Sequence, residues 1–172
     1  MKLVGVPDPY EYESPASWVS RLALSQGVTV PALFRYLDLE GIRDIDYGFT
    51  DAVAKKISRL TGVHESQFLY QRYMIRNLRS VKSSASKLLV TRNKRPAYRF
   101  CPACLGSNLN KYFQLHWRFE CWRMCPLHHC LLLDMCPQCG CAIRLPDSMI
   151  DAGPDQRGIA WLHRCLRCGN SI

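Results

Sequence analysis

Apolar side chains recur at helical spacing early in the chain. Ser14 and Pro15 form a start signal, because a Ser hydroxyl caps free N–H groups and Pro at the first helical position loses no hydrogen bond. Gly27 is placed to end this helix. A second apolar stripe then follows at helical spacing. The two stripes are Trp18, Val19, Leu22 and Ala23, then Leu33, Phe34 and Leu37. The pattern predicts a helix, a tight turn and a second helix.

The same pattern returns 35 residues later, with Thr50 as the cap, Gly62 as the stop and Phe68 in the following helix. In a helix-turn-helix a Gly takes the positive φ of the turn and an apolar residue packs back across it. We therefore expect a mainly α N-terminal domain with two helix-turn-helix-like pairs over residues 1–78. Paired helices also serve as plain core or as a protein-docking surface, and this alternative stays open.

The chain has ten cysteines, and all of them lie between Cys101 and Cys168. No apolar run is long enough for a membrane-spanning helix or a secretory signal, so we expect a cytoplasmic protein. Because thiols stay reduced in that compartment, metal binding is the usual reason for so many cysteines. We place a domain boundary near residue 100.

Four pairs of candidate ligands have the spacing that lets one tight turn present both to a single ion. They predict two small zinc modules, over residues 100–132 and 133–172. Each site is closed, so we expect two structural zinc ions and no catalytic residue. The predicted ligands are Cys101, Cys104, Cys125 and His128 in the first site, and Cys136, Cys139, Cys165 and Cys168 in the second. His129 remains an alternative to His128, because zinc also accepts a Cys and a His that are separated by three residues instead of two.

The remaining Cys and His residues are expected to be ordinary buried side chains. They are Cys121, Cys130, Cys141, His116, His129 and His163. An aromatic run over residues 112–122 has too little charge for a surface. We expect it to pack the two zinc modules together, with a base-stacking platform as the alternative.

The formal net charge of +9 is unevenly distributed, because residues 66–119 hold 11 basic residues and no acidic one. Such a segment can bind a phosphate backbone through counterion release. Within it, we expect residues 79–99 to form a basic linker between the helical domain and the first zinc module. The alternative is that the basic segment is merely solvated and binds nothing. The side chains expected to contact nucleic acid are Gln67, Gln71, Arg72, Arg76, Arg79, Lys82, Lys87, Arg92, Lys94 and Arg95.

The stretch 99–105, the pairs Tyr112-Phe113 and Trp117-Arg118, and the stretches 125–128 and 133–140 resemble the zinc signature of the TniQ family of bacterial transposons. Residues 13–23 are similar to its opening helix. His129 departs from the pattern, since the family usually has Gly at this position. The length is similar to that of the short TniQ forms found beside CRISPR effectors.

This resemblance implies a target-selection adaptor in DNA transposition, not a transposase. Such adaptors connect a CRISPR effector, another targeting complex or DNA itself to an AAA+ ATPase of the TnsC type, which recruits the transposase. The expected partners are therefore that ATPase, the targeting complex and DNA or guide RNA, with no membrane. A self-sufficient sequence-specific DNA-binding protein is the main alternative. A nuclease built on His128 and His129 has little support, because no Asp or Glu accompanies the pair.

Overall fold

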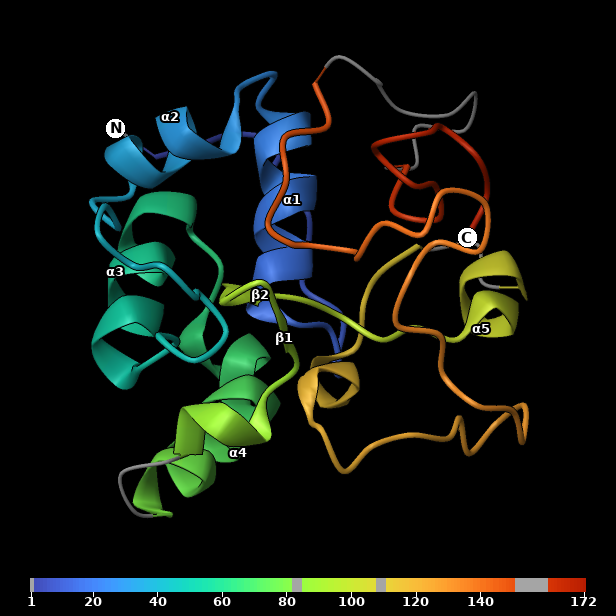
Figure 1. The fold of residues 1–172 in the computed structure, drawn as a ribbon. Helices are drawn as coiled ribbons and strands as arrows, with labels where there is room; N and C mark the ends of the chain where they lie inside the picture. Colours follow the sequence, from blue (N-terminus) through green and yellow to red (C-terminus); the bar gives the residue numbers. More distant parts are fainter. Residues whose placement is uncertain (1, 82–84, 108–110, 151–160) are drawn as a thin grey trace.

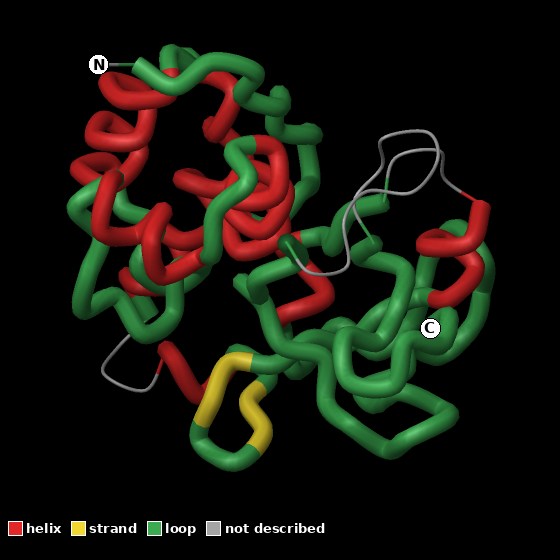
Figure 2. Tube along the Cα trace, turned by 90° about the horizontal axis from the view of Figure 1, so that it is seen from above, coloured by secondary structure: helices red, strands yellow, loops and turns green. Residues whose placement is uncertain are grey.

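The computed structural model describes residues 2–81, 85–107, 111–150 and 161–172. Helices form one side of the molecule, and the cysteine-rich half on the other side consists mostly of loops (Figures 1 and 2). The helices are α1 (Pro15–Ser25), α2 (Val30–Tyr36), α3 (Asp51–Thr61), α4 (Leu69–Ser80) and α5 (Pro102–Ser107), with 3₁₀ turns η1 (Glu65–Phe68), η2 (Ala85–Leu88) and η3 (Leu115–Arg118). A small antiparallel hairpin joins β1 (Thr91–Arg92) to β2 (Arg95–Pro96). The protein is thus helix-rich with a small sheet.

The helix ends follow the capping signals of the sequence. The Ser14 hydroxyl accepts a hydrogen bond from the Ser17 N–H, and Thr50 caps α3 in the same way. Gly62 ends α3 in the left-handed region with φ of 81°. The second helical pair differs from the expected form because η1 separates α3 from α4, and the helix-turn-helix geometry stays a prediction.

Helix α1 lies at the centre of the molecule, and eight of its eleven residues are buried. The segment around residues 145–149 crosses this helix (Figure 1). The Asp147 N–H donates to the Ser20 hydroxyl at 3.1 Å, and the Val30 N–H donates to the Ser148 hydroxyl at 3.0 Å. A segment that precedes the last two predicted ligands is therefore fixed against α1 and α2.

One hydrophobic cluster contains residues from both sides of residue 100, among them Trp18, Phe68, Phe113 and Trp117. Phe113 and Trp117 belong to the aromatic run, and their rings pack edge to face with centroids 5.6 Å apart. The run therefore packs in a core that contains residues of both predicted zinc modules and also residues of the helices. The predicted boundary near residue 100 separates two stretches of chain that fold against each other.

The basic segment 79–99 is also folded onto the body of the protein. Its residues Leu89, Val90 and Ala97 are buried. The Val90 N–H donates to the Arg118 carbonyl, and the Tyr98 N–H donates to the Ile143 carbonyl at 2.9 Å. The described part of this segment is therefore structured, and its cations extend from an ordered surface.

A buried ion network joins the two halves. The Arg118 side chain is fully buried and donates to Asp46 at 2.7 Å and to Asp44 at 2.8 Å. Tyr98 donates its hydroxyl to Asp46, and the Ala16 N–H donates to the same carboxylate at 2.9 Å. Burial would lower the pKa of Arg118, but the carboxylates of Asp46 and Asp44 keep it above its ordinary value. The guanidinium therefore stays charged within the core.

Candidate metal centres and basic surface

The first candidate metal centre gathers four ligand atoms from two loops. Cys101 directly precedes α5, Cys104 lies within its first turn, and Cys125 and His128 lie on a later turn. The Cys104 sulfur is 3.5 Å from the Cys125 sulfur and 3.2 Å from the His128 Nδ1. Zinc bound tetrahedrally at about 2.3 Å from each thiolate would place two sulfurs about 3.8 Å apart. The donor atoms and their separations therefore fit a single zinc ion.

The second candidate centre consists of four cysteines. The Cys136 and Cys168 sulfurs are 3.7 Å apart, and the Cys139 and Cys165 sulfurs are 3.6 Å apart. Within each centre, all ligand atoms lie within 4.8 Å of one another. The two clusters could hold two metal ions, and their sulfur and imidazole donors are those that structural zinc sites use.

Three of the four ligand turns share one hydrogen-bond pattern. The N–H of the first ligand residue donates to the carbonyl five residues later, and the N–H of the residue after the second ligand donates back to the first ligand's carbonyl. The donor–acceptor pairs are Cys125–Cys130 with His129–Cys125, Cys136–Cys141 with Gly140–Cys136, and Cys165–Asn170 with Gly169–Cys165. This pattern gives three turns of one shape.

The residue after the second ligand has a left-handed backbone in all three turns. Its φ is 49° at His129, 68° at Gly140 and 73° at Gly169. His129 therefore takes the position that glycine takes in the other turns, and His128 takes the ligand position. The geometry favours His128 over His129 as the fourth ligand of the first centre.

The ligand turns also supply hydrogen bonds to the thiols. Burial raises the pKa of Cys104. Burial would also raise the pKa of Cys125, but the N–H groups of His128 and Leu127 and the His128 ring outweigh it and lower that pKa to about 7. A thiol with a pKa near neutrality gives up its proton readily to a metal. Outside the predicted set, the Cys130 sulfur lies 3.6 Å from the Cys101 sulfur.

Most of the α4 residues expected to contact nucleic acid are held by other parts of the protein. Gln71 is 1 % exposed, and its amide donates to the Glu13 carbonyl at 2.7 Å. Arg72 and Arg76 both pair with Asp51 at the start of α3, at 2.6 and 2.7 Å. The Arg79 guanidinium lies over the Tyr47 ring. The sequence could not show these partners, because each lies more than 20 residues away in the chain.

Arg76 and Arg79 are nevertheless exposed, as are most of the other described residues predicted to contact nucleic acid. Gln67 is exposed, but it lies on η1 and not on α4. Lys87, Lys94 and Arg95 are exposed, whereas Arg92 pairs with Asp134. The prediction for Lys82 falls outside the described residues.

A profile of the TniQ family matches residues 4–132, three quarters of the chain. The chain belongs to the TniQ family. The match covers the helical half and the first metal centre, which agrees with the resemblance carried by the zinc motif. A comparison with curated proteins finds no match. The family associates this TniQ protein with transposition, as an adaptor. Within the described residues, no helix has the length and apolar character needed to cross a membrane.

Sequence reasoning missed two groups of residues in this TniQ protein. Arg118 was counted as part of a basic segment, although its side chain is buried against Asp46. Arg144 and Arg167 were not singled out, but both line a cavity beside the second metal centre. The burial of Arg118 depends on a partner 72 residues away, so no local pattern could reveal it. Cys121 and His129, both expected to be buried, are exposed.

Proposed function

We propose that this TniQ protein is a non-enzymatic target-selection adaptor in DNA transposition. It links a targeting complex, a CRISPR effector or DNA itself, to a TnsC-type AAA+ ATPase that recruits the transposase. The observation that carries this proposal is the family match over residues 4–132, which includes both the helical half and the first metal centre. An adaptor needs two binding surfaces, and two exposed surfaces of different chemistry support this role.

The first surface is apolar and lies on the first metal module. Met124, Leu127 and Leu131 are 55 %, 72 % and 69 % exposed. Met124 and Leu131 pair across an antiparallel bridge that flanks the ligand turn, so they lie side by side. Grouped exposed apolar side chains are typical of protein-binding surfaces. This group supports a protein partner on this module.

The second surface is basic, and Lys87, Lys94 and Arg95 supply its exposed cations. It supports weak, strongly salt-dependent contact with DNA or guide RNA. Sequence-specific reading of DNA by α4 alone has less support, because Gln71 is buried and Asp51 already pairs with Arg72 and Arg76. The adaptor is therefore the favoured function.

The two clusters would hold structural zinc. The predicted zinc modules span 33 and 40 residues, about the size below which a chain rarely folds on its own core. Metal binding supplies folding free energy in such modules, on the order of 10 kcal/mol. Zinc would hold the ligand turns that carry the apolar surface.

The test is co-sedimentation with the AAA+ ATPase of the same element, with an ATP analogue and DNA at two salt concentrations. We expect the protein to pellet with the ATPase and to remain bound at moderate salt. Leu131→Ser should weaken this pelleting, whereas the control Leu69→Ser, at an exposed apolar residue on α4, should leave it unchanged. Pelleting with DNA alone, unaffected by the ATPase, would contradict the adaptor and favour a direct DNA-binding protein.

A further inference from the structure

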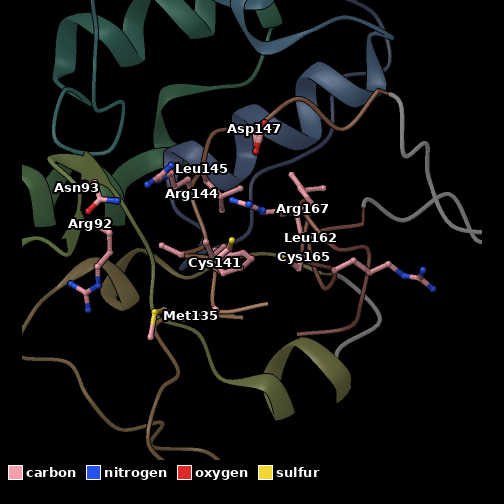
Figure 3. Close-up of a pocket in the computed structure, with 16 residues that line it drawn as sticks. Arg92, Asn93, Met135, Cys141, Arg144, Leu145, Asp147, Leu162, Cys165 and Arg167 are labelled. Carbon is pink, nitrogen blue, oxygen red and sulfur yellow. The ribbon is translucent and has the colours of Figure 1, made fainter. Parts of the chain in front are cut away.

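A cavity of about 500 Å³ lies between the β1–β2 hairpin and the second metal centre (Figure 3). Arg92 and Asn93 border it on the hairpin side, and the chain around the metal centre supplies further arginines. The charged lining residues are Arg92, Arg144, Arg164, Arg167 and Asp147. Four arginines and one aspartate therefore line this space.

Two of these four arginines have a partner among the residues that the structure describes. Arg92 pairs with Asp134, and the Arg164 guanidinium lies 3.8 Å from the centre of the Trp161 ring. Within the described parts of the chain, Arg144 and Arg167 form no ion pair, and the buried Nε of Arg144 has no hydrogen-bond partner. A guanidinium group that has no carboxylate partner in the protein can pair with an anionic ligand.

The metal centre itself is a possible reason for the positive charge, since four thiolates around Zn²⁺ leave two negative charges. However, no arginine nitrogen among the described residues hydrogen-bonds to a sulfur of this centre, whereas the Asn170 amide donates to the Cys168 sulfur at 3.5 Å. Among the described residues, neither Arg144 nor Arg167 is therefore held by a hydrogen bond to these thiolates.

The positive surface continues beyond the cavity onto the hairpin. Asn93 and Lys94 form its tip, with left-handed φ values of 52° and 59°, and Asn93 also lines the cavity. Lys94 and Arg95 are exposed next to it. A single carboxylate needs one guanidinium, but a row of cations suits a backbone with a charge on every unit.

We propose that the cavity binds the phosphodiester backbone of a nucleic-acid strand, with Arg144 and Arg167 as phosphate ligands and the hairpin tip as the continuation of the same path. The guanidinium fork can hold two phosphate oxygens at once. The inference deepens the proposed function by naming a nucleic-acid site on the adaptor, and it rests on that function only for its biological setting.

The test is fluorescence anisotropy of the zinc-loaded protein with labelled single-stranded DNA, duplex DNA and RNA over a range of salt concentrations. The double variant Arg144→Ala/Arg167→Ala should bind at least one of these probes more weakly. Its slope of log affinity against log salt should be shallower by about 2, one for each lost phosphate contact. The control Arg35→Ala/Arg59→Ala removes the same charge from α2 and α3 and should bind like the wild type. Zinc content and thermal melting verify that both variants fold.

Two results would overturn this inference. One is equal loss of binding in the two double variants, which would indicate general charge attraction without a site. The other is displacement of the oligonucleotide by poly-glutamate at equal charge concentration, which would indicate an acidic peptide as the ligand. The proposed adaptor function is tested separately, because the Arg144→Ala/Arg167→Ala variant should still pellet with the ATPase. Failure of the wild type to do so would contradict the adaptor and leave the nucleic-acid site standing.

Discussion

His129 shows how a single residue can depart from a family pattern without changing a turn. Its φ of 49° is one that a residue with a side chain adopts at a cost of about 1–2 kcal/mol. Glycine avoids this cost but loses more chain entropy on folding, typically about 0.4–1 kcal/mol. The balance between these two effects sets the stability expected when His129 is replaced by glycine.

We predict that His129→Gly keeps both metal ions and leaves stability unchanged or higher by up to about 1 kcal/mol, as measured by thermal melting and zinc content. His128→Gly is the matched control and should release the ion from the first centre. If His129→Gly instead lost that ion while His128→Gly kept it, the assignment of the fourth ligand would be reversed.

His116 is expected to make the stability of the protein depend on pH. Burial lowers its pKa to about 4, whereas an unfolded chain has the ordinary value of 6.5. Between these values the unfolded state binds a proton that the folded state does not, so the free energy of unfolding falls as the pH falls through this window. Urea unfolding at pH 7 and pH 5 should show a larger loss for the wild type than for His116→Gln. Because both proteins have the same metal centres, parallel losses would mean that His116 does not contribute.

At the scale of elements, Gln71 connects α4 to the segment that precedes α1. Its amide donates to the carbonyls of Glu11 and Glu13. Gln71→Leu leaves the buried Glu13 carbonyl without this donor and should lower the free energy of unfolding by about 1–3 kcal/mol, as measured in urea. Nucleic-acid affinity of the folded variant should not change, and the exposed control Gln67→Ala should affect stability little. Weakened DNA binding with unchanged stability would instead indicate that Gln71 contacts nucleic acid.

The sequence predicted those element features that depend on neighbouring residues. Ser14 and Thr50 cap helices and Gly62 ends one, because capping involves groups within one turn. The spacing of two residues between paired ligands likewise placed each pair on one turn. The environment of Gln71 could not be predicted, since its hydrogen-bond acceptors lie about 60 residues away in the sequence.

At the scale of the whole molecule, the ion network of Arg118 holds the helical and cysteine-rich halves together. Arg118→Met leaves Asp46 buried without its cation and should lower the free energy of unfolding by about 3–5 kcal/mol. Asp46→Asn should also destabilise the protein, and the double variant should lose less than the sum of the two single losses. Additive losses in urea unfolding would mean that the two groups do not act as a pair.

The arrangement of the two halves is the part of the fold that the sequence could not provide. Composition changes near residue 100 and predicts a boundary, but Tyr98 and Phe113 pack in one cluster with Trp18 of α1. Apolar side chains show no preference for a particular partner, so their pattern predicts burial without predicting what covers them. The division into separate domains stays a prediction.

We expect one zinc ion in each cluster, where it stabilises the protein and the two surfaces proposed to bind partners. Native mass spectrometry of protein purified without added metal tests it most directly. We expect two zinc ions per chain in the wild type and one in Cys165→Ser, with unfolding when a chelator removes both. A wild-type chain that holds no zinc, or that keeps its thermal transition unchanged after chelation, would contradict the account.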